Sequence, residues 1–399
     1  MTRELSSAYY AIINGVQALV ARAIHYYTKD RLLNTLLVYA AIKIIVLVGA
    51  IAVSLRYQPA ALLQNPNFLV KWDGFWYRGI ADKGYTYGYP ISAAFPPMYP
   101  ILIKIFSLNQ PALMPSVEVL ISNAFSFLGL YFLYKLVPLV VDERYRLRVC
   151  FAYMVFPALL VCNLVSYTEP IFLAFTIGAY YFWKRARFGY AALLAIFSIF
   201  TRQVGAFILA IFLVDMLYGY VSQRQRSQVI RQLTAIVITG AGVVMLYLFY
   251  LYRFGDPFIV SRIYGAWLTT FSITNISHNV GVLGFGGPGF WLYPRLVPFN
   301  YAVVPIFLID TLLVVATILA LLKRDLALSV YSFLSLALFL SGSSWPSSFV
   351  RYIAAIFPLY LFLGLMLSDN WQKNIVIGVI AVVIAIQNMF TWISGAWLY

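Results

Sequence analysis

The segment KWDGFWYRGIADKGYTYGYPISAAFPPMYP, residues 71–100, lies between two apolar stretches and is too polar and too aromatic to be a membrane span. A buried core segment would not carry Asp73, Arg78, Asp82 and Lys83 so close together. A solvated linker would not carry so many rings, which are Trp72, Phe75, Trp76, Tyr77, Tyr85, Tyr87 and Tyr89. The mixture predicts a surface where flat rings meet a polyhydroxylated ligand and one carboxylate does chemistry.

The composition is that of a polytopic membrane protein. Of the 399 residues, 63% are hydrophobic and 10% are charged, with a mean hydropathy of +0.85. Soluble domains are about 45–50% apolar and about 25% charged. The net charge of +15 does not indicate nucleic-acid binding, because the basic residues stand in short clusters between apolar runs, where orientation signals occur.

The apolar runs predict an all-α bundle of about 11 transmembrane helices (range about 9–12), at about 20 residues per crossing. Several runs are shorter than the ~17 residues that a perpendicular crossing needs, which indicates tilted, paired or re-entrant helices. We expect one transmembrane domain over residues 34–399, since no internal repeat is visible. The predicted spans are 34–56, 114–137, 149–166, 169–183, 188–201, 204–220, 229–252, 300–322, 326–341, 350–367 and 374–394.

The positive-inside rule predicts the orientation. With a cytoplasmic N-terminus, the basic clusters all face the cytoplasm, provided that 188–220 crosses twice with a turn near Thr201–Gln203. Residues 1–33 then form an amphipathic helix on the cytoplasmic membrane surface. Two long extracytoplasmic segments follow, which are 57–113 and 253–299. The first of them is expected to carry short juxtamembrane helices. The expected location is the cell membrane of a prokaryote or the endoplasmic reticulum membrane of a eukaryote. The clusters are Arg144/Arg146/Arg148, Lys184/Arg185/Arg187, Arg224/Arg226/Arg231, Lys323/Arg324 and Lys373.

The sequence carries no signature of a metal or cofactor. Cys150 and Cys162 are roughly 18 Å apart on one helix at about 1.5 Å per residue, so they cannot bond to each other within it. His25 and His278 are isolated, and no pair has metal-ligand spacing. No glycine-rich nucleotide-binding loop is present. We therefore expect no obligatory metal and no cofactor.

Asp73 is the candidate catalytic residue. It begins a predicted short helix that runs to Lys83 and is closed by Gly84. One interpretation is that Asp73 is only the N-cap of this helix, accepting hydrogen bonds from its free amides. The other is that it accepts a proton from an attacking hydroxyl, because it lies where a membrane span gives way to the aromatic segment.

Arg202 and Arg351 are candidate anion ligands. Arg202 falls in the middle of the apolar stretch 188–220, and Arg351 lies at the outer mouth of a span. Either side chain could simply extend to the membrane surface. Two outward cations at the mouth of one bundle instead suggest an anionic partner, and a guanidinium binds two phosphate oxygens at once.

Two further acids have simpler interpretations. Glu169, in the sequence SYTEPIF, is expected to pair with one of these Arg residues, with direct contact to sugar hydroxyls as the alternative. Asp256, in GDPF, is most simply a turn residue. A sugar site without a nucleotide site indicates a lipid-linked donor, whose phosphate an Arg would recognise and make a better leaving group.

These motifs resemble a known family. The run WDGFWYRGIADKGY…FPPMYP resembles the first extracytoplasmic loop of the GPI mannosyltransferase II (PIG-V) family and its prokaryotic relatives, which are multi-pass glycosyltransferases of the GT-C type. Further similar motifs follow in order, so the resemblance covers most of residues 60–365. They are FPALLVCNLVSYTEPIF at 156–172, Thr-Arg at 201–202, GDPF at 255–258 with Trp267, and FVRYIAAIFPLY at 349–360.

The resemblance implies inverting transfer of a mannose from a polyprenyl- or dolichyl-phosphate donor to an acceptor hydroxyl on a glycolipid or glycan. It places Asp73 as general base and Arg202 and Arg351 as donor-phosphate ligands. Two positions depart from the family: Lys83 stands near a frequent His, and Gln203 stands where a Pro often follows Thr-Arg.

Three side chains complete the predicted substrate pocket. Trp72, Trp76 and Tyr77 are expected to shape the space for sugar and acceptor, with Glu169 beside them. Two rival functions stay open: a transporter or flippase for lipids or polyprenyl-linked sugars, and a non-catalytic membrane scaffold whose outer loop binds glycans. Transporters usually show repeated halves around a midplane site, whereas the scaffold would not need Asp73.

Overall fold

The computed structural model describes residues 31–222, 226–266, 300–322, 324–341 and 349–395. Within these ranges the chain is all-helical, with no strand. The predicted surface helix 1–33 lies almost wholly outside the described residues, and so does most of the predicted segment 253–299. The fold class expected from the sequence is confirmed.

Five helices among the described residues are long and apolar enough to cross a membrane. Each consists of more than 18 residues with few charges, so its main-chain groups are satisfied within the helix. They are α2 (Arg31–Tyr57), α6 (Met114–Val140), η4 (Gln203–Phe207) continued by α11 (Ile208–Val221), α12 (Val229–Phe254) and α20 (Trp371–Ile393).

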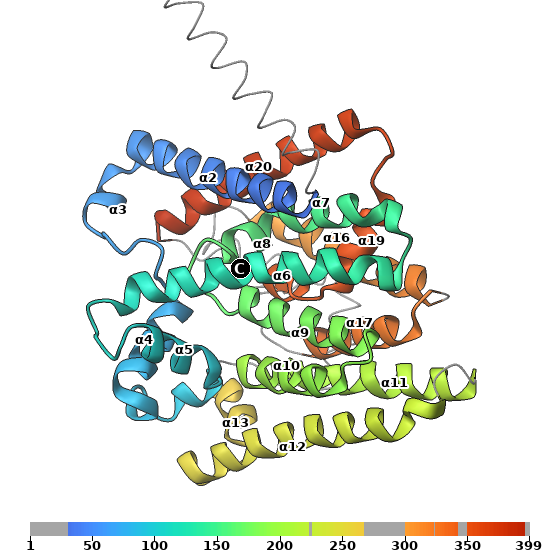
Figure 1. The fold of residues 1–399 in the computed structure, drawn as a ribbon. Coiled ribbons are helices and arrows are strands. Elements are labelled where there is room, and N and C mark those ends of the chain that lie inside the picture. The colour runs from blue at the N-terminus through green and yellow to red at the C-terminus, as the bar shows by residue number, and fades with distance from the viewer. Residues whose placement is uncertain (1–30, 223–225, 267–299, 323, 342–348, 396–399) are drawn as a thin grey trace, which may run out of the picture.

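Four further apolar helices match predicted spans closely. In Figure 1 they lie beside the longer helices in one bundle. Two of them, α10 (Phe188–Thr201) and α17 (Leu326–Ser341), have the predicted bounds. The other two are α9 (Glu169–Lys184) and α16 (Asn300–Leu321).

The span predicted over 149–166 is not continuous. It is divided into α7 (Arg146–Val155) and α8 (Pro157–Cys162), with Phe156 extended between them (φ −63°, ψ 114°). The cause is local, because Pro157 has no N–H to donate and disfavours the helical conformation of the residue before it. Cys150 and Cys162 therefore lie on two helices and not on the single helix that was expected; both thiols are buried and free.

The span predicted over 350–367 is also divided. It forms α18 (Phe349–Ala354) and α19 (Pro358–Met366), joined by tight turns at Ala355 and Ile356. Helix α7 packs on α19, and α8 packs on α18. The two interrupted spans are therefore neighbours in the interior of the bundle.

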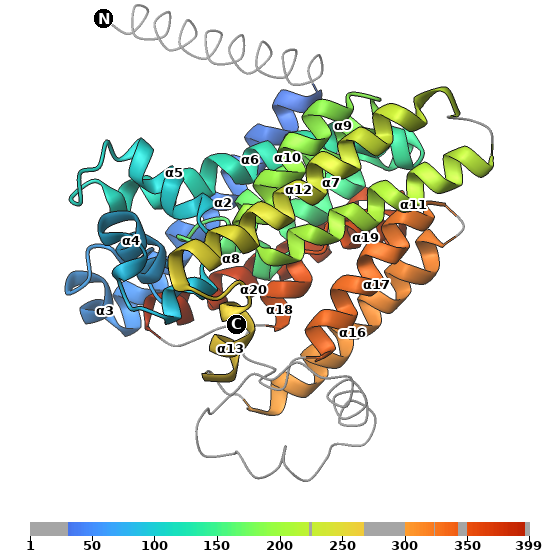
Figure 2. The ribbon, with the colours of Figure 1, turned by 90° about the horizontal axis from the view of Figure 1, so that it is seen from below.

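The two ends of the bundle differ in chemistry. The first loop forms α3 (Pro59–Leu63), α4 (Asp73–Lys83) and α5 (Met98–Phe106), which gather at one end of the bundle in both views (Figure 1 and Figure 2). At the other end, Arg148 binds Asp369 (2.9 Å), and Lys184, at the end of α9, lies 3.3 Å from Asp325. The aromatic loop and these basic connections thus lie at opposite ends of the bundle, while the orientation in the membrane stays a prediction.

The first loop has an apolar core of its own. Its buried members include Tyr77, Ile80, Tyr85, Phe95 and Tyr99, which pack with residues of α6, α9, α10 and α12. The Trp76 ring stacks on Phe95 at a centroid distance of 5.3 Å. The loop is therefore a folded cap on the bundle, and α4 is fixed in place by burial of its apolar face.

Helices α7 and α19 approach each other closely at Gly364. A Cβ atom at this position would lie 2.6 Å from the main chain of Val149. Small residues allow helix backbones to pack at such short range in membrane proteins. The contact links the two interrupted spans, which carry the segments that lead to the site described below.

We expect Gly364→Ala to destabilise the protein by about 1–3 kcal/mol, because the added methyl group overpacks a contact with main-chain atoms. The matched control is Gly240→Ala in α12, where a Cβ would meet nothing within 4 Å. That change should be neutral or stabilising by up to about 1 kcal/mol. Thermal unfolding in detergent measures both, and equal effects of the two substitutions would contradict the packing argument.

Candidate functional site

Asp73 is the first residue of α4, and the helix has the predicted bounds Asp73–Lys83. The N-cap position is held by Trp72, and no side chain caps the helix, so the N-cap interpretation of Asp73 is wrong. Trp72 has a positive φ of 51°, which costs a bulky residue conformational energy and is typical of functional sites. This unusual turn directs the chain so that Asp73 faces the bundle.

Four charged side chains meet in one network. Asp73 Oδ2 accepts a hydrogen bond from Arg351 Nη1 at 2.6 Å. Arg351 Nε lies 3.2 Å from Glu169 Oε1. The same Glu169 oxygen binds Arg202 Nη1, which also donates to Thr168 Oγ1 at 3.2 Å. The structure thus brings together Asp73, Glu169, Arg202 and Arg351, which are far apart in the sequence.

Burial is uneven across this network. The Glu169 and Arg351 side chains are 1% and 6% exposed, whereas those of Arg202 and Asp73 are 16% and 21% exposed. Both Arg side chains point inward onto a carboxylate, so the interpretation that they extend to the membrane surface is wrong. The expected pairing of Glu169 with these Arg residues is confirmed. Asp73 and Arg202 are the more exposed members of the network.

Each charge lies at a helix end of matching polarity. Asp73 and Glu169 are the first residues of α4 and α9, where a helix dipole favours negative charge. Arg202 is the C-cap of α10, and Arg351 lies in the last turn of α18. Arg202 is extended (φ −150°, ψ 138°), which forms the predicted turn at 201–203. The helix ends therefore stabilise the charges that the bundle buries.

Two tyrosine rings that the sequence analysis did not select complete the cation site. The Arg351 guanidinium lies 4.6 Å from the Tyr167 ring centroid and 5.3 Å from that of Tyr352. Tyr352 is also 5.3 Å from the Arg202 guanidinium. Ring faces attract cations, so the tyrosines hold both guanidiniums in place. Their positions beside Glu169 and Arg351 in the sequence were the available signal.

Tyr77 connects α4 to this network. Its hydroxyl lies 3.4 Å from Thr168 Oγ1, and its ring packs against Phe95 and Tyr99. Burial, and next the nearby negative charge of Asp73, raise the pKa of Tyr77. The raised pKa keeps Tyr77 a neutral phenol, in hydrogen-bond contact with Thr168, and it is not a candidate base.

The two tryptophans predicted to shape the pocket have different surroundings. Trp72 is half-buried and packs against the main core of the bundle beside Asp73. Trp76 lies within the loop, against Phe95 and Tyr87. Trp72 is thus adjacent to the ion pairs, while Trp76 supports the loop that carries them.

Lys71 anchors the start of α4 to the last described helix. Its Nζ donates to the main-chain oxygens of Trp392 (3.0 Å) and Ile393 (2.7 Å) at the C-terminal end of α20, where a cation is favourable. Trp392 Nε1 in turn donates to the Phe68 oxygen at 2.9 Å. The segment 68–71, which leads to Asp73, is therefore fixed to the end of α20 by hydrogen bonds in both directions.

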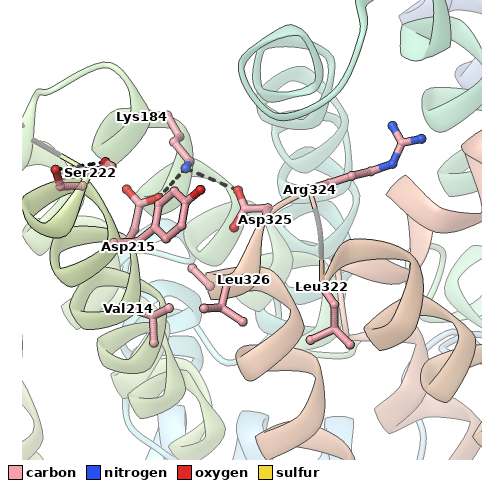
Figure 3. A pocket seen from close by; sticks show the side chains of 11 residues that line it. Lys184, Val214, Asp215, Ser222, Leu322, Arg324, Asp325 and Leu326 are labelled. Carbon is pink, nitrogen blue, oxygen red and sulfur yellow. Dashed lines mark hydrogen bonds and ion pairs between the residues drawn. The ribbon is translucent and has the colours of Figure 1, made fainter. Parts of the chain in front are cut away.

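A second polar cluster lies at the opposite end of the bundle. Figure 3 shows the Lys184 ammonium between Asp215 of α11 and Asp325, which precedes α17. Asp325 also accepts from the Tyr180 hydroxyl, and Asp215 from Trp183 Nε1 at 2.7 Å. A cavity of about 200 Å³ adjoins the cluster. Because each of these charges is paired, we interpret the cluster as a brace between α9, α11 and α17.

Among the described residues, no group of three His, Cys, Asp or Glu side chains could hold a metal ion. Asp256, by contrast, behaves as predicted. Its Oδ1 accepts from the Phe258 N–H at 3.0 Å, directly after Gly255, whose φ of 73° ends α12. Asp256 is therefore a turn residue.

Comparison with protein-family models and with curated proteins finds no match. Solved structures of the oligosaccharyltransferase of the archaeon Archaeoglobus fulgidus are similar in fold. The apo form gives a TM-score of 0.52 at 15% identity, over 94% of this chain and 57% of that one. A form with zinc and sulfate gives 0.48 at 16% identity, over 89% and 53%.

A third structure of that enzyme, with an inhibitory peptide and a dolichol-phosphate, gives 0.49 at 15% identity, over 93% and 56%. The chain spans a little over half the length of these proteins. At this identity the similarity to the apo form shows a shared fold and nothing further.

We expect Arg351→Met to destabilise the protein by about 3–5 kcal/mol, because Asp73 loses its partner and Glu169 keeps only one. Arg253→Met, an exposed position in the last turn of α12, is the matched control and should change stability by less than about 0.5 kcal/mol. Thermal unfolding in detergent compares them. A small and equal loss for both would show that the network contributes little to stability.

We expect Lys71→Met to free the start of α4, at a cost of about 1.5–3 kcal/mol for hydrogen bonds to a charged donor. Limited proteolysis of the first loop reports the loosening, together with the thermal midpoint. Lys104→Met, at an exposed position in α5, serves as the control. Unchanged cleavage of the loop in Lys71→Met would contradict the anchoring role.

Proposed function

We propose that the protein is a membrane glycosyltransferase that moves a mannose from a polyprenyl- or dolichyl-phosphate donor to an acceptor hydroxyl, with inversion, on the extracytoplasmic side. The observation that carries the proposal is the network in which a partly exposed Asp73 stands beside two guanidiniums. A lipid-phosphate donor needs cations for its phosphate, and the attack needs a base.

Arg351 and Arg202 are the proposed ligands of the donor phosphate. Both bind the same Glu169 oxygen, so their guanidiniums are held close together. Phosphate oxygens are bound well by such paired guanidiniums, which also stabilise the negative charge that grows on the leaving phosphate. Glu169 is better suited to hold the two cations than to contact a sugar, since its side chain is only 1% exposed.

Asp73 is the proposed general base. In the reaction, the acceptor oxygen bonds to the anomeric carbon of mannose as the bond from that carbon to the phosphate oxygen breaks. The hydroxyl proton passes to Asp73, and the bonding electrons leave with the lipid phosphate. Trp72 and Tyr77, next to Asp73, are the proposed walls for sugar and acceptor; Trp76 supports them through the loop core.

The fold and the sequence motifs support the same class of reaction. The chain has the fold of the apo oligosaccharyltransferase, a membrane enzyme that transfers sugars. The motifs around Asp73, Arg202 and Arg351 are those that resemble the PIG-V family. Because fold similarity alone does not determine a substrate, mannose and the acceptor rest on the motifs.

One observation favours a second candidate, a transporter or flippase for polyprenyl-linked sugars. The interrupted spans α7–α8 and α18–α19 pack on each other, and discontinuous helices packed together are typical of transporter sites. The ion pair between Asp73 and Arg351, however, joins α4 of the first loop to the bundle, which suits a reaction at one membrane face.

The test is transfer from a synthetic polyprenyl-phosphate mannose by the purified protein, with wild type beside Asp73→Asn. The amide keeps the shape of the side chain but cannot take up the proton, so transfer should fall by ~10²-fold or more. Asp82→Asn, an exposed acid on the same helix, should transfer like wild type. Thermal unfolding confirms that each variant is folded.

Two other outcomes are informative. If Asp73→Asn transfers as fast as wild type, Asp73 is not the base. If the folded wild type transfers from none of the lipid-linked sugars tested but moves them across liposome membranes, the flippase is the function.

A further inference from the structure

Asp73 and the donor phosphate need the same partner. The proposed function assigns Arg351 to the phosphate, yet in the structure Arg351 Nη1 is bound to Asp73 Oδ2 at 2.6 Å. A carboxylate held by a guanidinium is a poor proton acceptor, because neutralising it would leave a buried cation with less compensation. The base and the phosphate ligand therefore block each other in this arrangement.

The charges of the network are already balanced. Arg202 and Arg351 supply two positive charges, and Asp73 and Glu169 supply two negative ones. A donor phosphodiester adds one more negative charge to a largely buried site. A buried uncompensated charge is costly, so one carboxylate must leave its guanidinium when the phosphate binds.

Asp73 is the carboxylate that is free to leave. Glu169 is bound by both Arg side chains and is 1% exposed, whereas Asp73 has one ion pair and is 21% exposed. Asp73 also belongs to the loop helix α4, while Glu169 begins α9 inside the bundle. Departure of Asp73 keeps the two guanidiniums together, because Glu169 still binds both.

We propose that the donor phosphate exchanges with Asp73 on Arg351, and that this exchange releases the base. The inference rests on the proposed function and extends it with an order of events: the donor phosphate displaces Asp73 from Arg351 as it binds, and only then does Asp73 accept the proton of the acceptor. Without donor, the Asp73 carboxylate occupies the phosphate position and acts as an internal competitor. Glu169 is the positioning residue that keeps the cation pair assembled throughout.

The exchange predicts an effect on binding that a base without a competing role would not have. Removing the Asp73 carboxylate from Arg351 should tighten the binding of phosphate. We expect Asp73→Asn to bind a short-chain polyprenyl phosphate about tenfold more tightly than wild type, where a tenfold change corresponds to about 1.4 kcal/mol of coupling. Calorimetry on the full chain in nanodiscs of uncharged lipid measures the affinity. The uncharged polyprenol of the same length gives the baseline for lipid binding alone.

Asp82→Asn is the matched control, since it removes the same charge from an exposed position of the same helix. It should leave the affinity for polyprenyl phosphate unchanged. A gain as large as that of Asp73→Asn would mean that the general field of the loop, not exchange at Arg351, sets the affinity, and would overturn the proposal.

The remaining outcomes separate this inference from the proposed function. If wild type prefers the phosphate over the polyprenol but Asp73→Asn binds it no more tightly, the exchange is wrong and the transferase proposal stands. If neither protein prefers the phosphate over the polyprenol, the lipid-phosphate donor itself is wrong, and the exchange fails with it.

Discussion

The site depends on the pairing of one buried carboxylate, that of Glu169, with the guanidiniums of Arg202 and Arg351. Removing a charge from water is costly unless several partners compensate it, and Glu169 has two guanidiniums on one oxygen. Through them it joins the start of α9 to the end of α10 and to the last turn of α18, while Arg351 extends the connection to α4. Four segments are thus joined through the Glu169 carboxylate and the Arg351 guanidinium.

The positions at which helices end and begin decide where the charged residues lie. In a membrane, irregular backbone is tolerated only where protein covers it, so interruptions concentrate in the interior of a bundle. Pro157 and Pro358 divide two spans there, and the divided spans pack on each other. The second break creates the short helix α18, whose last turn carries Arg351. The other three charges of the network lie at ends of α4, α9 and α10, each with the polarity that the helix dipole favours.

The sequence predicts helices well and contacts poorly in this protein. The bounds of α4, α10 and α17 follow from composition, capping residues and apolar runs, which are local. Asp73, Glu169, Arg202 and Arg351 could be selected because charge is rare in such a chain. That Asp73 and Arg351 are paired across 278 residues could not be seen, since only the packing of helices brings them together. The division of two spans at Phe156 and Ala355 was not predicted, because each apolar run is continuous in composition and the proline within it was not weighed as a helix breaker.

The contact between Lys71 and the end of α20 sets an order of assembly. The first loop is synthesised early, but its anchor includes the carbonyls of Trp392 and Ile393, which are 321 and 322 residues further along the chain. Arg351 likewise emerges late. Glu169 and Arg202 can pair as soon as α10 is in place, whereas the pair between Asp73 and Arg351 can form only after α18 has been inserted. An insertion intermediate that ends before α18 thus lacks the guanidinium that contacts Asp73.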